Sequence, residues 1–292
     1  MSIKKWLEKN GSRLDGKTVA ISGSTGGLGR ELCRHLASLG ASLILLDRNR
    51  QRSLCLGEEI SRLFPSVSIS YITVDMEDIA SVKAAADALL QIKVDFLILN
   101  AGAYAIPRKK CDTGFDNVFQ INFISPYYLA RKLFPSIKER DGRVIIVSSI
   151  AHNYSESDTE DIDFSKRTKS SLVYGNAKRY LTYSLSELFA DSGALAITHP
   201  GITFTNITAH YPKFIFAIIK YPMKVIFMKP RKAALSILSG VFTSTEKGTW
   251  IGPRLFNVWG LPKKKRLNTA KSDEIRRISE TAEEIFCRIS IL

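Results

Sequence analysis

Two side chains that could carry out acid–base chemistry, Tyr174 and Lys178, stand four residues apart in the segment Tyr-Gly-Asn-Ala-Lys. Residues at this spacing share one face of a helix, so a helix here would place a phenol beside an ammonium group. A tyrosine with its ordinary pKa of about 10 is a poor acid or base at neutral pH, and an adjacent cation stabilises its phenolate. On its own, the pair is equally compatible with a half-buried tyrosine that only packs.

A glycine-rich turn near the N-terminus suggests what this pair would serve. Its sequence, Ser22-Gly-Ser-Thr-Gly-Gly-Leu-Gly29, follows an apolar run at 17–22 and precedes helical periodicity at 30–39. Glycines in such a turn let the backbone approach a pyrophosphate, which the N-terminus of the following helix then stabilises. The alternative is a turn that only joins a strand to a helix. The sequence favours a bound dinucleotide whose hydride transfer needs a proton partner.

The elements that must hold these residues alternate between apolar strands and helices. Near-continuous apolar strands of this kind indicate a parallel sheet that is covered on both faces. We therefore predict an α/β protein with a doubly wound, Rossmann-like parallel sheet in a single domain at 1–292, whose ligands bind at the carboxyl ends of the strands. Strands are expected at 17–22, 42–46, 68–74, 96–99, 143–147 and 194–198, and helices at 30–39, 50–63, 79–90, 115–138 and around Tyr174.

The net charge of +14, from 42 basic and 28 acidic residues, is the unusual number in the composition. Nucleic acid, an anionic membrane surface or a phosphate-bearing ligand would each explain it, while a solvated face explains any single run. Much of the charge lies in a run at 263–266 and in lysines interleaved with apolar residues at 213–232. No nucleic-acid-binding motif accompanies them, so nucleic acid is not an expected partner.

The cysteines, the histidines and the apolar segments indicate the cellular compartment in which the protein works. The four cysteines and four histidines are scattered, which indicates a reducing compartment and no bound metal. The N-terminus lacks the long apolar stretch of a secretory signal, although Ile3, Trp6 and Leu7 would share one face of a short docking helix. The apolar stretch at 214–228 is interrupted by lysine and proline, so it falls short of the roughly 18 residues of a membrane span. We expect a cytoplasmic protein, with peripheral association with a membrane as a further hypothesis.

Six motifs, taken in order, resemble those of the short-chain dehydrogenase/reductase family. The glycine turn matches the family's cofactor motif, with Ser22 where threonine is usual. The resemblance covers roughly residues 15 to 260 of the chain. The other matches are Asn100-Ala101-Gly102 after the fourth strand, the catalytic tetrad of Asn122, Ser149, Tyr174 and Lys178, and Pro200-Gly201-x-x-x-Thr205.

The resemblance implies an oxidoreductase that interconverts an alcohol and its ketone or aldehyde with NAD or NADP. Tyr174 would be the general acid in reduction and the base in oxidation, while Lys178 would lower its pKa and hold the nicotinamide ribose. Ser149 would hydrogen-bond the substrate oxygen, and Asn122 would hold a water that relays protons to the lysine. For Asn122, a structural amide bonded to nearby backbone remains the alternative.

The resemblance also implies the residues that bind the cofactor. Asp75 would contact the adenine, unless it only caps a helix. Thr205 would bond the carboxamide, unless it caps a local turn. The other expected cofactor-binding residues are Gly23, Ser24, Thr25, Gly27, Leu28, Gly29, Asp47, Arg48, Asn100, Ala101, Gly102, Tyr174, Lys178, Pro200, Gly201 and Ile202.

The choice between NAD and NADP rests on two adjacent residues. Asp47, if it faces the ribose, would take both hydroxyls of NAD and repel a 2′-phosphate. Arg48 follows where NADP users of the family commonly carry a cation, and an outward Asp47 paired with Arg50 would reverse the preference. The sequence favours NAD only slightly.

Two regions differ from the usual pattern of the family, and both would affect which substrate the protein binds. Ser149 and Tyr174 are separated by 24 residues, more than is usual, and the segment at 149–152 resembles the retinol dehydrogenase-like branch. The polar loop at 155–169 would be either a rim of the active site or a solvated excursion. The apolar segment at 203–232 is expected to form a helical lid over an apolar steroid-, retinoid- or lipid-like substrate, with core or dimer packing as the alternative.

Three further expectations concern assembly and activity. Many relatives pair through the helix that carries the Tyr-Lys motif, so the resemblance implies a homo-oligomer, either a dimer or a tetramer. Residues 261–292 are expected to form a basic C-terminal tail. A non-catalytic dinucleotide-binding sensor or scaffold is the alternative to an enzyme. The complete tetrad argues against it, because a site that no longer catalyses a reaction would be free to lose Tyr174 or Lys178.

Overall fold

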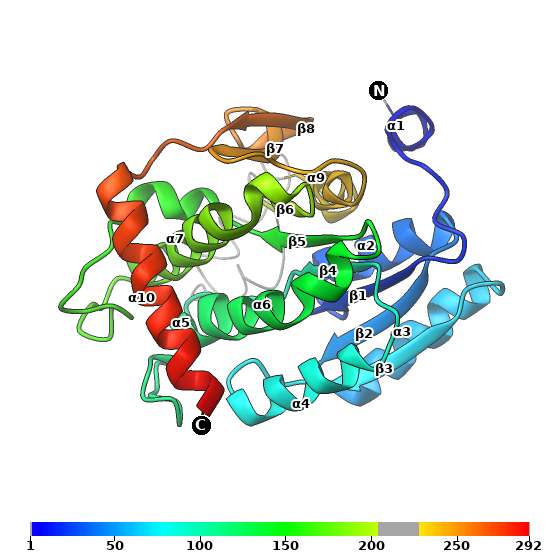
Figure 1. The fold of residues 1–292 in the computed structure, drawn as a ribbon. Coiled ribbons are helices and arrows are strands. Elements are labelled where there is room, and N and C mark those ends of the chain that lie inside the picture. Colours follow the sequence, from blue (N-terminus) through cyan, green and yellow to red (C-terminus); the bar gives the residue numbers. More distant parts are fainter. Residues whose placement is uncertain (1, 204–227, 292) are drawn as a thin grey trace, which may run out of the picture.

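The computed structural model describes residues 2–203 and 228–291, which form one eight-stranded sheet with helices on both faces (Figure 1). The strand order is β3-β2-β1-β4-β5-β6-β7-β8, and within these residues only β7 and β8 pair antiparallel. The predicted fold class, a doubly wound Rossmann-like α/β sheet, is therefore confirmed. The strands are β1 (Thr18–Ser22), β2 (Ser42–Asp47), β3 (Ile69–Thr73), β4 (Phe96–Leu99), β5 (Arg143–Val147), β6 (Leu195–Thr198), β7 (Thr249–Leu255) and β8 (Trp259–Arg266).

The connections of the sheet diverge at β1. This strand pairs with β2 on one side and with β4 on the other, so Ser22 lies opposite both Leu46 and Leu99. The chain first adds β2 and β3 on one side of β1 and then crosses back to add β4 to β8 on the other. In sheets of this kind, the point where the strand order reverses opens a crevice for a ligand at the carboxyl ends of the strands.

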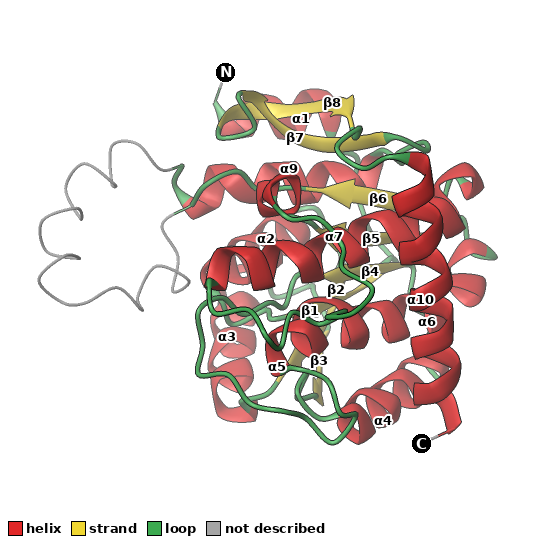
Figure 2. Ribbon diagram, turned by 90° about the vertical axis from the view of Figure 1, so that its left-hand side faces the viewer, coloured by secondary structure: helices red, strands yellow, loops and turns green. Residues whose placement is uncertain are grey.

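Two apolar cores hold the helices against the sheet. One core lies beneath α4, α6, α7 and α10, and the other beneath α1, α2, α3 and α9 (Figures 1 and 2). Successive side chains of a strand point to opposite faces, so Ile44 enters the first core while Leu43 and Leu45 enter the second. The helices are α1 (Ile3–Asn10), α2 (Gly27–Ser38), α3 (Arg50–Leu63), α4 (Ile79–Leu90), α5 (Asn117–Phe119), α6 (Ser125–Lys138), α7 (Ser170–Phe189), α9 (Pro230–Phe242) and α10 (Ser272–Ile291).

The residues expected as a basic C-terminal tail, 261–292, belong to β8 and α10 over most of their length. A buried ion pair holds the start of α10, because Arg179 of α7 donates hydrogen bonds of 2.7 and 2.6 Å to Glu274. α10 therefore packs against α7, the helix through which the resemblance implies pairing. Its apolar stripe consists of Ile278, Ala282, Ile285 and Ile289.

Two segments whose roles were open pack onto the rest of the chain. Trp6 is buried in the second core, so the apolar face of α1 docks on its own protein. The loop at 155–169 is tied down by Arg108, which donates hydrogen bonds of 2.9 Å to the carbonyls of Arg167 and Phe164. These contacts hold the loop against the rest of the chain, and its role, as a rim of the active site or a solvated excursion, stays a prediction.

The expected lid lies mostly outside the described residues, as does Thr205. Thr203 and Met228 border this gap and form a parallel bridge with one another. Over the ranges 2–203 and 228–291, no helix combines the length and apolar character needed to cross a bilayer. The same ranges contain no group of three side chains suited to hold a metal ion.

Candidate active site

The glycine turn between β1 and α2 brings backbone segments very close together. Gly23 has a φ of +67°, in the left-handed region that favours glycine, and a Cβ there would lie 3.0 Å from the Cα of Ala101. A Cβ on Gly29 would overlap the carbonyl oxygen of Gly23. The N-cap of α2, Gly26, makes no side-chain hydrogen bond, so the helix keeps its first backbone N–H groups available for an anion.

Ser22 and Asn100 tie this turn to the end of β4. Ser22 Oγ accepts hydrogen bonds of 3.0 Å from the backbone N–H groups of both Asn100 and Ala101. In return, Asn100 Nδ2 donates to the carbonyl oxygens of Ser22 at 3.0 Å and Gly23 at 3.1 Å. The separation of the two strand ends that border the crevice is therefore fixed by side-chain hydrogen bonds from both sides.

Asp47, at the end of β2, directs its carboxylate to the glycine turn. Its Oδ1 accepts from the backbone N–H of Thr25 at 3.1 Å and from the Thr25 hydroxyl at 3.0 Å. Its Oδ2 accepts from Ser53 Oγ at 3.0 Å and from the Ser24 hydroxyl. Both oxygens are thus engaged within the protein. This arrangement differs from both expectations, a carboxylate open to the ribose and one paired with Arg50.

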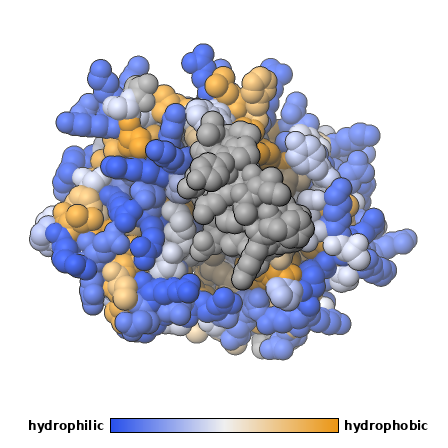
Figure 3. All heavy atoms as spheres, turned by 180° about the vertical axis from the view of Figure 1, so that it is seen from behind, coloured by the Kyte–Doolittle hydropathy of each residue, from blue (hydrophilic) through white to orange (hydrophobic). Residues whose placement is uncertain are grey.

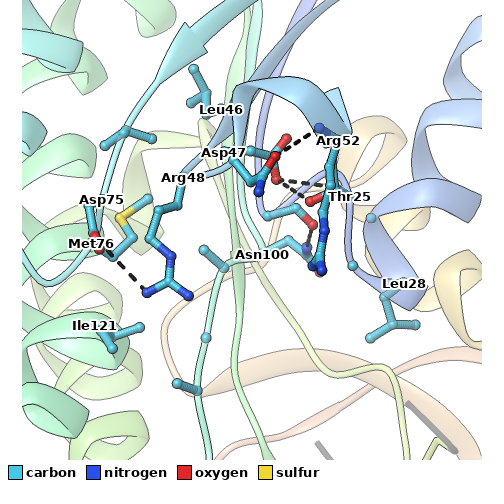
Figure 4. A pocket seen from close by; sticks show the side chains of 18 of the residues that line it. Thr25, Leu28, Leu46, Asp47, Arg48, Arg52, Asp75, Met76, Asn100 and Ile121 are labelled. Atoms are coloured by element: carbon cyan, nitrogen blue, oxygen red, sulfur yellow. Dashed lines mark hydrogen bonds and ion pairs between the residues drawn. The ribbon is translucent and has the colours of Figure 1, made fainter. Parts of the chain in front are cut away.

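A pocket of about 330 Å³ lies in the crevice at the carboxyl ends of β1 to β4 (Figure 4). Its volume falls in the range of small-molecule sites. Arg48 points toward Asp75, with 4.0 Å between the guanidinium and the carboxylate, and Arg52 of α3 also lines the pocket. The expected cofactor-binding residues that line it are Gly23, Thr25, Gly27, Leu28, Gly29, Asp47, Arg48, Asp75, Asn100, Ala101 and Gly102.

Asp75 is not the cap of the helix that follows it. The N-cap of α4 is Asp78, whose side chain accepts from the N–H groups of Ala80 and Ser81. Asp75 Oδ1 accepts instead from the backbone N–H of Glu77 at 3.0 Å. The helix-cap alternative for Asp75 is therefore wrong.

Tyr174 and Lys178 lie on the same face of α7, as their spacing predicts. Lys178 Nζ is 5.7 Å from the centroid of the Tyr174 ring, and the lysine is only 2% exposed. The ammonium donates a 2.9 Å hydrogen bond to the carbonyl oxygen of Val147, at the end of β5. A Cβ on Gly102 would lie 3.7 Å from the same nitrogen. The lysine therefore reaches the edge of the pocket, where α7 and the ends of β4 and β5 converge.

Burial dominates the proton affinity of both groups. It raises the pKa of Tyr174 to about 12, while a hydrogen bond with Ser149 acts in the opposite direction and Tyr104 adds to the increase. Burial also lowers the pKa of Lys178 to about 7. The increase in the pKa of the phenol is opposite in direction to the lowering that was expected from the lysine.

Ser149 stands at the end of β5, beside Tyr174. Its hydroxyl accepts from the backbone N–H of Ala151 at 3.2 Å and caps a short 3₁₀ turn, Ile150–Tyr154. His152, buried within this turn, contacts the Ser149 carbonyl through Nδ1, and burial lowers the pKa of its imidazole to about 4. At neutral pH the imidazole is uncharged, so Nδ1 holds the backbone of Ser149 as a neutral donor.

Asn122 lies in a π-helical turn, Gln120–Ile124, between α5 and α6. Its Nδ2 donates hydrogen bonds of 2.8 Å to the carbonyls of Ala103 and Val118, and its Oδ1 accepts from the N–H of Ala103 at 3.3 Å. These bonds fit the alternative of a structural amide. Such π turns concentrate at functional sites, and the proton-relay role of Asn122 stays a prediction.

The last expected motif follows β6 at the same edge of the sheet. Gly201 has a φ of +84°, and a Cβ there would lie 2.6 Å from the carbonyl oxygen of Val258. The carbonyl of Ile202 accepts a 3.1 Å hydrogen bond from the N–H of Met228. Pro200, Gly201 and Ile202 do not line the pocket of Figure 4.

Ser53 and His152 were not among the expected site residues. Ser53 bonds the Asp47 carboxylate from the first turn of α3, and serine is too common there to carry a signal. His152 stands three residues after Ser149, but its role depends on a turn that sequence periodicity does not indicate.

Comparison with known proteins agrees with this arrangement. A family model described as short chain dehydrogenase matches residues 17–160. Retinol dehydrogenase 12 of Mus musculus is 27% identical over an alignment of 263 positions, which covers 84% of this chain and 83% of that protein. A crystal structure of an uncharacterised protein from Mycobacterium paratuberculosis aligns with a TM-score of 0.73 and 24% identity, and covers 94% of this chain and 95% of that one.

L-Sorbose reductase from Gluconobacter frateurii, solved with NADPH and L-sorbose, aligns with a TM-score of 0.60 and 18% identity, over 79% of this chain and 91% of that one. Other similar structures also hold NADP. These likenesses support the predicted short-chain dehydrogenase/reductase: the chain is an oxidoreductase that resembles the retinol dehydrogenases. The slight lean to NAD gains no support from these comparisons.

Ser22→Ala tests the tie between β1 and β4. The change leaves the N–H of Ala101 without its acceptor and leaves that of Asn100 with only the carbonyl of Ile98, and an unsatisfied donor of this kind costs about 1–3 kcal/mol. We expect urea unfolding to report a loss of this size, together with weaker dinucleotide binding. Ser22→Thr retains the hydroxyl and should restore both properties, so equal losses in the two variants would contradict the role given to Ser22 Oγ.

Proposed function

We propose that the protein is an NADP(H)-dependent oxidoreductase that interconverts an alcohol and its ketone or aldehyde on an apolar, retinoid-, steroid- or lipid-like substrate. The observation that carries this proposal is the convergence of Tyr174, Lys178 and Ser149 at the edge of the glycine-lined pocket. The likeness to retinol dehydrogenase 12 supports the apolar substrate class.

The residues of the pocket fit a dinucleotide. Gly23 and Gly29 allow the backbone of the turn to pack closely, because a side chain at either position would overlap neighbouring backbone. The N-terminus of α2 has no side-chain cap that would compete with a pyrophosphate. Asp75 at the pocket wall would meet the adenine end, and Lys178, beside Gly102, would meet the nicotinamide ribose. When bound, the cofactor supplies or accepts the hydride.

Tyr174 provides the proton in carbonyl reduction. Burial keeps its phenol protonated at neutral pH, so it can donate to the substrate oxygen as negative charge develops there. Ser149 hydrogen-bonds the tyrosine and would donate to the same substrate oxygen. In oxidation the roles reverse, and the phenolate accepts the proton of the alcohol.

Lys178 stabilises the phenolate that forms when Tyr174 has given its proton away. With a pKa of about 7, its amine can hold a charge at neutral pH, and that charge lies close to the tyrosine ring. Its bond to Val147 fixes the nitrogen against β5, which leaves its remaining N–H groups for the ribose and the phenol.

Tyr174→Phe removes the proton donor and should lower turnover by at least about a hundredfold, since general acid–base groups contribute factors of this size. Binding of NADPH, measured by fluorescence titration, should stay within about twofold of the wild type because the ring still packs in place. The assay is a screen of apolar alcohols and ketones with both cofactors. Substantial activity in the variant would contradict the mechanism, and silence of the wild type across the screen would favour the non-catalytic sensor or scaffold.

The cofactor preference follows from charge at the ribose end of the pocket. Both oxygens of Asp47 accept hydrogen bonds from the glycine turn and from α3, so they are not free to receive two ribose hydroxyls. Two guanidinium groups, Arg48 and Arg52, line the same pocket. A 2′-phosphate would meet these cations, and charge-assisted bonds of this type are stronger than neutral ones.

The double variant Arg48→Ala/Arg52→Ala tests this preference. Loss of two charge-assisted hydrogen bonds should weaken NADPH binding by about tenfold or more, while NADH binding should change by less than about twofold. Arg62→Ala on the same helix is the matched control, because Arg62 bonds the carbonyl of Glu58 away from the pocket. Equal losses for NADPH and NADH would rule out a phosphate-specific role.

A further inference from the structure

A second groove, which shares no lining residue with the pocket at the glycine turn, is enclosed by α1, α9 and the β7–β8 hairpin. Its volume is about 620 Å³, and its lining carries four cations and no carboxylate. In Figure 2, α1 lies behind β7 and β8 at one end of the molecule. The cations are Lys9, Lys232, Arg254 and Lys263, and the other lining residues are Trp6, Asn10, Leu255, Gly260, Leu261 and Pro262.

Carboxylates near this groove pair with other lysines. Glu8 on α1 lies 4.0 Å from Lys4, and Glu246 accepts a 2.9 Å hydrogen bond from Lys264. Neither lysine lines the groove. The cations that do line it are therefore not neutralised by these carboxylates, and the groove presents a positive surface to a ligand.

The tip of the adjoining hairpin exposes apolar side chains. Phe256 is 92% exposed and Leu255 is 52% exposed. Phe256 and Asn257 have φ values of +51° and +58°, and the N–H of Val258 donates to the Leu255 carbonyl at 2.9 Å. This is a turn with two left-handed residues, which favours asparagine or glycine, so phenylalanine at its first position is strained.

Inward contacts hold this turn in its strained form. Lys265 Nζ donates to Asn257 Oδ1 at 2.8 Å, and His199 Nε2 contacts the Asn257 carbonyl at 2.9 Å. The asparagine is thus anchored to β8 and to the end of β6, while its neighbour Phe256 projects outward. A strained backbone that presents an exposed aromatic ring points to a function for that ring, because the fold gains nothing from its position.

We infer that the groove and the hairpin tip together form a docking face for an anionic membrane surface. Phe256 and Leu255 would enter the headgroup region, and the four cations of the groove would meet lipid phosphates and carboxylates. Figure 3 shows hydrophobic side chains among hydrophilic ones along the upper edge of the molecule, the end at which β7 and β8 lie in Figure 1. This mixture of exposed aromatic and basic side chains suits the interface of a bilayer.

The docking face adjoins the substrate end of the proposed active site. The carbonyl of Val258, in the hairpin turn, packs against Gly201 at the end of β6. A docked molecule would therefore turn this edge of the sheet toward the lipid, from which an apolar substrate could enter. This last step rests on the proposed function, whereas the docking itself does not.

The sequence-based membrane hypothesis relied on Trp6, on the run at 263–266 and on the apolar stretch at 214–228. Trp6 is buried against the protein's own core, so its ring is not available to a bilayer. The apolar stretch lies outside the described residues except for Met228. The run contributes Lys263 to the groove, and Phe256 takes the place that the hypothesis gave to Trp6.

Co-sedimentation of the full chain with vesicles tests the inference. Vesicles of phosphatidylcholine alone are compared with vesicles of about three parts phosphatidylcholine to one part phosphatidylserine. We expect binding to the anionic vesicles only, with release at high salt as the charges are screened. Equal binding to neutral vesicles, or no binding to either, would overturn the proposal. Retention on heparin without vesicle binding would indicate a soluble polyanion and would overturn it as well.

Phe256→Gly separates docking from stability, because it removes the ring and also relieves the left-handed strain. We expect anionic-vesicle binding about tenfold weaker and a melting temperature no lower than that of the wild type. Arg254→Gln/Lys263→Gln should weaken binding by about fivefold for each charge removed. Wild-type binding by either variant would contradict the docking face.

Matched controls lie outside the docking face. Leu63→Ser removes another exposed leucine, at the end of α3, and Lys138→Gln removes another exposed lysine, at the end of α6. Both should bind anionic vesicles as the wild type does, and weaker binding in either would mean that general surface properties govern the interaction. Tyr174→Phe should also bind normally, so failure of the catalytic proposal and failure of the docking proposal can be told apart.

Discussion

A lysine ammonium enclosed by protein is the constraint around which the site is arranged. Lys178 is 2% exposed, and burial lowers the pKa of its amine to about 7. Within the described part of the chain, its hydrogen bond goes to the carbonyl of Val147, although an ammonium has three donors. A buried, incompletely satisfied cation is costly. We propose that ribose hydroxyls and the Tyr174 phenolate complete its shell, in which case the free energy of burial would be recovered only in the working complex.

The parallel sheet supplies the rigidity that this arrangement needs. Ser22 at the end of β1, Asn100 after β4 and Ser149 after β5 all leave the sheet at one edge. Side-chain hydrogen bonds then join neighbouring strand ends, and the imidazole of His152 holds the backbone that follows β5. Sites on such elements are held more closely than sites on loops. The chemistry is therefore positioned by the same strands that form the two cores.

The first six strands were predictable because five of them are nearly continuous apolar runs and β3 alternates apolar and polar residues, and each is followed by a turn or a polar residue. β7 and β8 were not, since β7 contains Gly252 and Pro253 and the exposed edge strand β8 ends in the basic segment Lys263–Arg266. α10 was also missed, because the segment was interpreted as a basic tail, although Ile278, Ala282, Ile285 and Ile289 have the spacing of an amphipathic helix.

The site was predictable in its residue types and less so in its contacts. The spacing of Tyr174 and Lys178 determines that they share a face, and the glycine pattern requires the close approach seen between Gly23 and Ala101. The direction of the Asp47 carboxylate depends on donors that only the fold brings together, such as Ser53. The strain at Phe256 depends on the hairpin geometry and has no signal in the sequence.

The pH dependence of alcohol oxidation at saturating cofactor, for the wild type and for Lys178→Met, tests the central claim most directly. Oxidation requires the Tyr174 phenolate, so kcat should rise with pH along a single apparent ionisation of the coupled pair. A charged lysine favours the phenolate, so its loss should move this midpoint upward by about one pH unit or more. A wild-type profile without a rising limb, or a midpoint that stays unchanged in Lys178→Met, would contradict the claim that these two side chains carry the proton transfer.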